Sequence, residues 1–272
     1  MRLAGDVPAA RPLALLGAGL LAAMVVAQVA SGLRPEPIRL TGVVVVLLAS
    51  SAVAFLADRR GPARAAGAFA GAVAIGYAAE WIGIRTGVPF GRYAYTPVLW
   101  PQAGGVPVLV AVAWGGMGLA AHAVAAAVAP RNRLARWAAG AAALTAWDLF
   151  LDPQMLRLGL WTWADGGPYR GVPLTNFAGW LAVSFLVMAA IDLIAGREDV
   201  RPPWTPGPFV RTAPPAGPGP SRGLVTLYAV MAGMETLAFA AVFEPRDPLV
   251  AAAGGVAMGA FAVPAWRRAW QR

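Results

Sequence analysis

Residues 106–129 read VPVLVAVAWGGMGLAAHAVAAAVA, with His122 as their single ionisable side chain. A helix needs about 20 mostly apolar residues to cross the hydrocarbon core of a bilayer, so this run predicts a transmembrane helix. Similar apolar runs occur near residues 13–30, 40–57, 65–84, 134–151, 173–195, 223–243 and 248–266. The sequence therefore predicts an all-α, polytopic membrane protein of about eight transmembrane helices, in a single domain over residues 1–272.

The composition excludes several classes of chemistry. Of the 272 residues, 58% are hydrophobic and 13% are charged, whereas soluble domains have about 25% charged residues. Cysteine is absent, which excludes disulfide bonds, a thiolate nucleophile and cysteine-ligated metal centres. With a single histidine and no lysine, the chain also cannot form a multi-histidine metal site or a lysine Schiff base.

The arginines predict the orientation in the membrane. The net charge is +9, and the 22 basic residues, all arginines, separate the apolar runs, so we expect no nucleic-acid partner. With eight spans, 15 arginines lie on one side and 7 on the other, which predicts that both termini are cytoplasmic. Residues 200–222 are rich in proline and predict a cytoplasmic linker. The bias toward Ala, Gly, Pro and Arg is typical of a high-GC bacterium, so the predicted location is the bacterial cytoplasmic membrane.

Four acidic residues of the predicted spans are expected in one layer near the outer boundary. Glu80, Asp148 and Asp152 fall at the same depth, and Glu235 lies somewhat deeper. An ionisable group inside a bilayer costs roughly 2.5–3.5 kcal/mol, so each is a candidate for function. Asp148 and Asp152 are four residues apart and share a helix face, where two carboxylates cannot both ionise cheaply. The layer can thus hold a proton donor and a proton acceptor together.

A second interpretation of these acids is that they pair with arginines in the outer loops, namely Arg85, Arg92, Arg157 and Arg170. Two further polar residues lie toward the cytoplasmic side. Asp192 is expected to be a solvated or salt-bridged surface carboxylate, because it is near the end of its span. His122 is expected to make a hydrogen bond between packed helices.

Aromatic residues gather in two of the outer loops, residues 83–105 and 152–171. An interfacial belt of Trp and Tyr is expected in any membrane protein and explains part of this excess. The rest would suit a carbocation, because a cation is attracted to an aromatic ring face by about 0.5–2 kcal/mol.

Five short segments carry a family resemblance. They are EWIGIRTG (residues 80–87), FGRYAYT (90–96), GVP (105–107, followed by Trp114), WDLFLDP (147–153) and GVPLTNF (171–177, followed by Trp180). Together they resemble the CruF-type carotenoid hydratases, over roughly residues 65–245. The resemblance implies an integral membrane enzyme without a cofactor, with the lipid bilayer and a carotenoid as its partners. It also implies addition of water across the terminal C1–C2 double bond of an acyclic carotenoid such as γ-carotene or lycopene, or bisanhydrobacterioruberin in archaeal relatives.

Our hypothesis for this reaction rests on the acidic layer. Asp148 or Asp152 protonates C2, the other serves as its charge partner, and Glu80 positions the water, although Glu80 and the pair can exchange roles. The residues expected to bind the substrate, the cation or the water are Trp81, Tyr93, Tyr95, Trp114, Trp147, Asn176, Trp180 and Glu235. Other functions remain open, namely a carotenoid end-group cyclase, a prenyltransferase, or a proton-coupled transporter or scaffold that uses the same acids.

Overall fold

The computed structural model describes residues 11–33, 38–196 and 221–271. These residues form the α-helices α1 (Pro12–Leu33), α2 (Ile38–Arg60), α3 (Pro62–Thr86), α4 (Val108–Val128), α5 (Arg133–Arg157), α6 (Leu174–Ala195), α7 (Arg222–Leu237) and α8 (Pro248–Trp270). A short π-helix, η1 (Ala238–Val242), continues α7. Each of the eight apolar runs is thus a helix, as predicted. The predicted linker, apart from its last two residues, lies outside the described residues.

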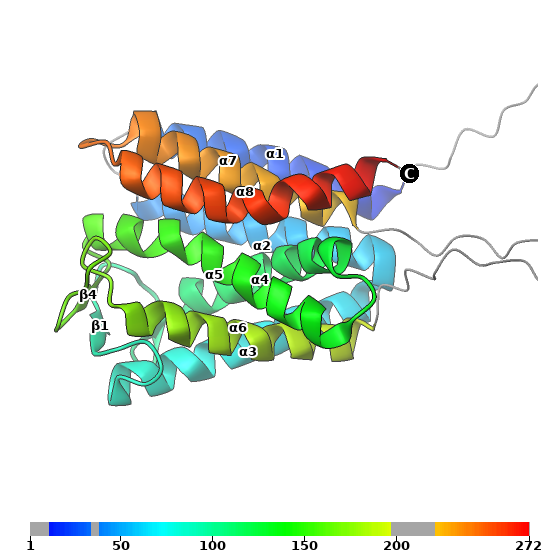
Figure 1. Ribbon diagram of the computed structural model, residues 1–272. Coiled ribbons are helices and arrows are strands. Elements are labelled where there is room, and N and C mark those ends of the chain that lie inside the picture. Colours follow the sequence, from blue (N-terminus) through cyan, green and yellow to red (C-terminus); the bar gives the residue numbers. More distant parts are fainter. Residues whose placement is uncertain (1–10, 34–37, 197–220, 272) are drawn as a thin grey trace, which may run out of the picture.

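The helices pack as one bundle with α4 at its centre (Figure 1). Seven of the helices in the described residues are long and apolar enough to cross a membrane, and α5 is not among them. The polar residues that set α5 apart include Arg136, Asp148 and Asp152, and all three are buried inside the protein. Helix α4 contacts α2, α3, α5, α6, α7 and α8. Its small residues allow this close packing, since a Cβ added at Gly116 would lie 3.0 Å from the Cα atom of Ala49 on α2.

Two small antiparallel sheets lie at one end of the bundle, in addition to the predicted helices. Strand β1 (Tyr93–Tyr95) pairs with β4 (Trp161–Trp163), and β2 (Gln102–Ala103) pairs with β3 (Val106–Pro107). In the first sheet Tyr93 lies opposite Trp163, and Tyr95 lies opposite Trp161. Side chains alternate along a strand, so all four rings point toward the helices while Ala94 and Thr162 are exposed. The two aromatic loops therefore join to form a cover over this end of the bundle (Figure 1).

The opposite end of the bundle contains a buried ion-pair cluster. Asp192 of α6 has a fully buried side chain that accepts hydrogen bonds from Arg136 Nη2 at 2.9 Å and Arg133 Nε at 3.0 Å. His122 Nε2 of α4 lies 3.4 Å from the same carboxylate, which confirms the expected contact between helices. The expectation that Asp192 is a surface carboxylate was wrong, because Arg136 of α5 is itself buried and supplies the opposite charge inside the bundle.

Candidate active site

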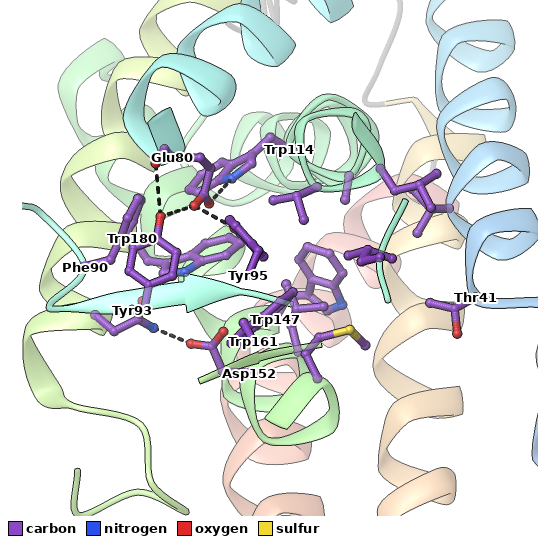
Figure 2. Close-up of a pocket in the computed structure, with 18 of the residues that line it drawn as sticks. Thr41, Glu80, Phe90, Tyr93, Tyr95, Trp114, Trp147, Asp152, Trp161 and Trp180 are labelled. Carbon is purple, nitrogen blue, oxygen red and sulfur yellow. Dashed lines mark hydrogen bonds between the residues drawn. The ribbon is translucent and has the colours of Figure 1, made fainter. Parts of the chain in front are cut away.

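Glu80 of α3 is a buried carboxyl group that accepts three side-chain hydrogen bonds. The hydroxyl groups of Tyr93 and Tyr95 both donate to Oε2, the latter at 2.8 Å, and Trp114 Nε1 donates to Oε1 at 3.0 Å. Tyr93 can come this close because Gly83 stands one turn further along α3, where a Cβ would lie 2.7 Å from the Tyr93 hydroxyl oxygen. Donors from β1 and α4 therefore meet both oxygens of Glu80 (Figure 2).

The two tyrosines that bind Glu80 remain hydrogen-bond donors over a wide pH range. Burial of the Tyr93 side chain, together with the adjacent Glu80 carboxyl group, raises the pKa of its hydroxyl. The same two causes raise the pKa of the Tyr95 hydroxyl well above its usual value. Both hydroxyls thus keep their protons at neutral pH and hold the Glu80 side chain in one orientation.

A second acidic pair lies on α5, facing α6. Asp148 and Asp152 are one helical turn apart and both are buried. The side-chain amide of Asn176, near the start of α6, donates to Asp148 Oδ2 at 2.8 Å and also to Asp152 Oδ2. The remaining oxygen of Asp148, Oδ1, is buried and has no hydrogen-bond partner among the described residues. One amide group therefore ties the two carboxyl groups together.

Helix α5 continues through a proline next to this pair. Pro153 lies inside the helix and has no N–H group, so the carbonyl of Leu149 one turn earlier lacks its usual helical donor. The Tyr169 hydroxyl donates to that carbonyl at 2.9 Å and so satisfies it. The loop between α5 and α6 thereby stabilises the helical turn that carries Asp152.

Glu80 and the Asp152–Asn176 group face one aromatic cavity, which measures about 690 Å³ together with the open space at its mouth. Its polar lining includes Glu80, Asp152 and Asn176. Its aromatic lining consists of Phe90, Tyr93, Tyr95, Trp114, Trp147, Trp161, Trp163 and Trp180 (Figure 2). The rings of Trp114 and Trp180 stack with centroids 4.1 Å apart. Asp148 is not part of the lining and lies behind Asp152 and Asn176.

The structure brings most of the predicted site residues together. Tyr93, Tyr95, Trp114, Trp147, Asn176 and Trp180 all line this cavity. Trp81 does not: it is 42% exposed and packs under the Arg85 guanidinium, whose Cζ lies 4.0 Å from the ring centroid. Consecutive residues of a helix point about 100° apart, so Trp81 faces outward where Glu80 faces inward. Glu235 lines a neighbouring cavity.

The alternative that the acids pair with loop arginines is wrong. Arg92 pairs with Asp165, and Arg170 pairs with Asp247. Arg85 donates to the backbone carbonyls of Trp81 and Gly104, and Arg157 donates to that of Pro245. These four cations hold the loops together, and in the described part of the chain no ion pair joins them to Glu80, Asp148, Asp152 or Glu235.

Comparison with known proteins identifies the family. Residues 41–210 match the family described as carotenoid biosynthesis protein. This chain belongs to that family. Over 203 residues it is 30% identical to bisanhydrobacterioruberin hydratase of Haloarcula japonica, an alignment that covers 70% of this chain and 67% of the relative. No solved structure matches the chain. The resemblance seen in the sequence is thereby confirmed for the family.

In this carotenoid biosynthesis protein, the acids of the site and Asn176 fall inside the matched family region. Glu80, Asp148, Asp152 and Asn176 all lie within residues 41–210, whereas Glu235 lies outside them. The site therefore belongs to the part of the chain that defines the family.

Three aromatic cavity residues of this carotenoid biosynthesis protein were missed as site residues, namely Phe90, Trp161 and Trp163. A signal for the two tryptophans was present in the sequence, because Tyr-Ala-Tyr and Trp-Thr-Trp both alternate large rings with small residues. That alternation is typical of strands, but pairing of the two segments depends on helices that bring the loops to the same end. In the described ranges no group of three or more His, Asp or Glu side chains is arranged to hold a metal ion.

Proposed function

We propose that the protein is a carotenoid hydratase that adds water across the terminal C1–C2 double bond of an acyclic carotenoid end, giving a tertiary 1-hydroxy group. One observation carries this proposal: Glu80 and the hydrogen-bonded pair Asp152 and Asn176 line the same cavity, whose walls are aromatic. A relative whose name states a carotenoid hydratase activity supports the reaction class. The location of the cavity within a membrane bundle suits an oily substrate.

The first step is proton transfer to the alkene. Asp152 lines the cavity and Asp148 does not, so Asp152 is the group that gives its proton to C2. The π electrons form the new C2–H bond and leave a tertiary cation at C1. Asn176 stays hydrogen-bonded to Asp152 and stabilises the carboxylate that forms, while the same amide also holds Asp148 in place.

Aromatic ring faces of the cavity stabilise the C1 cation until a water molecule adds to it. Trp114, Trp147 and Trp180 form one contiguous aromatic wall, in which the Trp147 and Trp180 centroids are 6.2 Å apart. Each ring face attracts a cation by about 0.5–2 kcal/mol. The wall also excludes bulk water, which limits loss of the cation to side reactions.

The second step is capture of the cation by one water molecule. Glu80 is arranged as a hydrogen-bond acceptor, since Tyr93, Tyr95 and Trp114 all donate to it. It takes a proton from the water as the water oxygen bonds to C1. Return of that proton to Asp152 restores the starting state, and the product has gained the atoms of one water.

Expression in a host that makes lycopene tests the proposal against the alternatives. A hydratase yields pigments heavier by the mass of one water for each end that reacts. A cyclase yields products of unchanged mass, a prenyltransferase yields larger products and requires a diphosphate donor, and a transporter or scaffold yields no altered carotenoid. A pigment profile identical to that of the empty host would refute the proposal.

A further inference from the structure

A second cavity lies beside the aromatic cavity and measures about 1110 Å³ together with the open space at its mouth. It lies among α1, α2, α5, α7 and η1. Six residues line both cavities, namely Thr41, Val45, Ala113, Trp147, Leu151 and Met155. The two cavities are therefore adjacent, and Trp147 is part of the lining of each.

The second cavity opens at the side of the bundle. Its lining includes apolar side chains that are also exposed on the helix surfaces, namely Val29 at 49%, Leu33 at 78%, Leu237 at 54% and Val242 at 39%. These residues belong to α1 and to the α7–η1 segment, which lie together on the flank away from α3 and α6 (Figure 1). Exposed apolar side chains on such a flank face lipid, so the opening leads into the bilayer.

Two contacts in the described residues join α1 to the α7–η1 segment beside this opening. Gln28 Nε2 of α1 donates to the Met231 sulfur of α7 at 3.6 Å, a weak acceptor. At the loop end of α1, Gly32 brings the backbone against η1, since a Cβ there would lie 2.9 Å from Val242 Cγ1. Neither contact involves charged groups.

We propose that the opening between α1 and α7 admits a long acyclic polyene from the bilayer, and that the second cavity holds the chain segment next to the reacting end. This inference rests on the proposed function, because it places the reacting end in the aromatic cavity beside Glu80 and Asp152. The chain passes Trp147 and Met155, and the remainder extends past Val29 and Leu237 into lipid. Glu235 lines this path, with its Oε2 atom buried and without a hydrogen-bond partner in the described part of the chain.

Cysteine labelling tests the path directly, because the chain has no cysteine of its own. Val29→Cys places a thiol at the opening, and Val26→Cys, one turn away on α1 and 68% exposed, places one outside the cavity. In detergent solution, saturating lycopene is expected to slow N-ethylmaleimide labelling of Val29→Cys at least fivefold and to leave Val26→Cys unchanged. Equal labelling rates with and without lycopene at both positions would overturn the inference.

The same two variants also report turnover. A bulky maleimide attached to Val29→Cys is expected to lower lycopene conversion at least tenfold relative to a methylthio group at that position, while both adducts of Val26→Cys convert lycopene normally. Equal conversion by the two Val29→Cys adducts would overturn the proposed path. If lycopene protects Val29→Cys but the unmodified protein yields no hydrated product, the proposed function fails while the polyene path stands.

Discussion

The side-chain amide of Asn176 donates to Asp148 Oδ2 at 2.8 Å across the boundary between α6 and α5. The same nitrogen donates to Asp152 Oδ2, so one residue of α6 determines the arrangement of both acids on α5. A leucine at this position has a similar size but donates no hydrogen bond. The Asp148 and Asp152 carboxyl groups then face each other without a bridging donor.

We therefore expect Asn176→Leu to lower turnover at least tenfold and to destabilise the protein. A hydrogen bond contributes about 0.5–1.5 kcal/mol to stability, and about 1.5–3 kcal/mol when its acceptor is charged, so the thermal midpoint in detergent should fall as well. The matched control is Leu174→Ala, at an exposed position on the first turn of α6. Turnover of Asn176→Leu equal to that of the control would show that the amide bridge is not needed.

The two aspartates of α5 should respond differently to amide substitution. Asp152 lines the cavity and Asp148 does not, so Asp152→Asn removes the proton donor and should lower kcat by about 10²–10⁴-fold. Asp148→Asn keeps the donor and should reduce kcat less. The measurement is the initial rate of each variant on lycopene, at equal amounts of folded protein. A larger loss for Asp148→Asn than for Asp152→Asn would reverse the assigned roles.

Substitution of two tryptophans distinguishes a role in the cavity from a role at the membrane interface. Trp180 stacks on Trp114 inside the cavity, whereas Trp81 lies outside it. Loss of a cation–π contact of about 0.5–2 kcal/mol corresponds to a rate reduction of roughly 2–30-fold. We expect Trp180→Leu to show this loss in kcat and Trp81→Leu to retain normal turnover. Equal effects of the two substitutions would argue against cation stabilisation by the cavity wall.

Because of the loop ion pair between Arg170 and Asp247, the free energy of unfolding should decrease as the pH becomes acidic. Partial burial of Asp247 acts to raise its pKa, but the hydrogen bonds from Arg170 and from the Val250 backbone outweigh it, so the pKa of Asp247 lies below its ordinary value of 3.8. A carboxyl group with a lowered pKa stabilises the fold above its unfolded-state pKa, and that contribution disappears as pH falls through the folded-state pKa.

Thermal unfolding in detergent at pH 7 and below pH 3.8 measures this effect. The wild-type midpoint should be higher at pH 7, and Asp247→Asn should reduce the difference between the two conditions. Asp165→Asn is the comparison variant: it breaks the more exposed pair with Arg92 and should therefore reduce the difference less. If the difference between the two midpoints is the same in Asp247→Asn as in the wild type, the Arg170–Asp247 pair contributes nothing to the acid sensitivity.

The sequence predicted the helices well, because an apolar run long enough to span a bilayer must satisfy its own backbone hydrogen bonds, and a single segment does so as a helix. It also predicted that Glu80, Asp152 and most of the aromatic residues meet, since the spans that carry them reach the same boundary. The strand pair β1–β4 could not be predicted in the same way, because its partners are separated in sequence and are brought together by helix packing.

For two residues the position along the chain did not predict the direction of the side chain. Trp81 shares the depth of Glu80, but the helical rotation between adjacent residues turns it away from the cavity. Asp192 is near a helix end, yet it is buried because Arg136 of another helix covers it. In both cases the position along the helix could be predicted from the sequence, whereas the direction of the side chain depended on the neighbouring helices.

Isotope labelling of the product tests proton donation and water capture in one experiment. When the protein converts lycopene in water enriched in deuterium and oxygen-18, we expect each hydrated end to carry one deuterium at C2 and one oxygen-18 at C1. Glu80→Gln and Asp152→Asn should form little of this doubly labelled product. A product without either label, or normal formation of it by both variants, would contradict hydration by these two carboxyl groups.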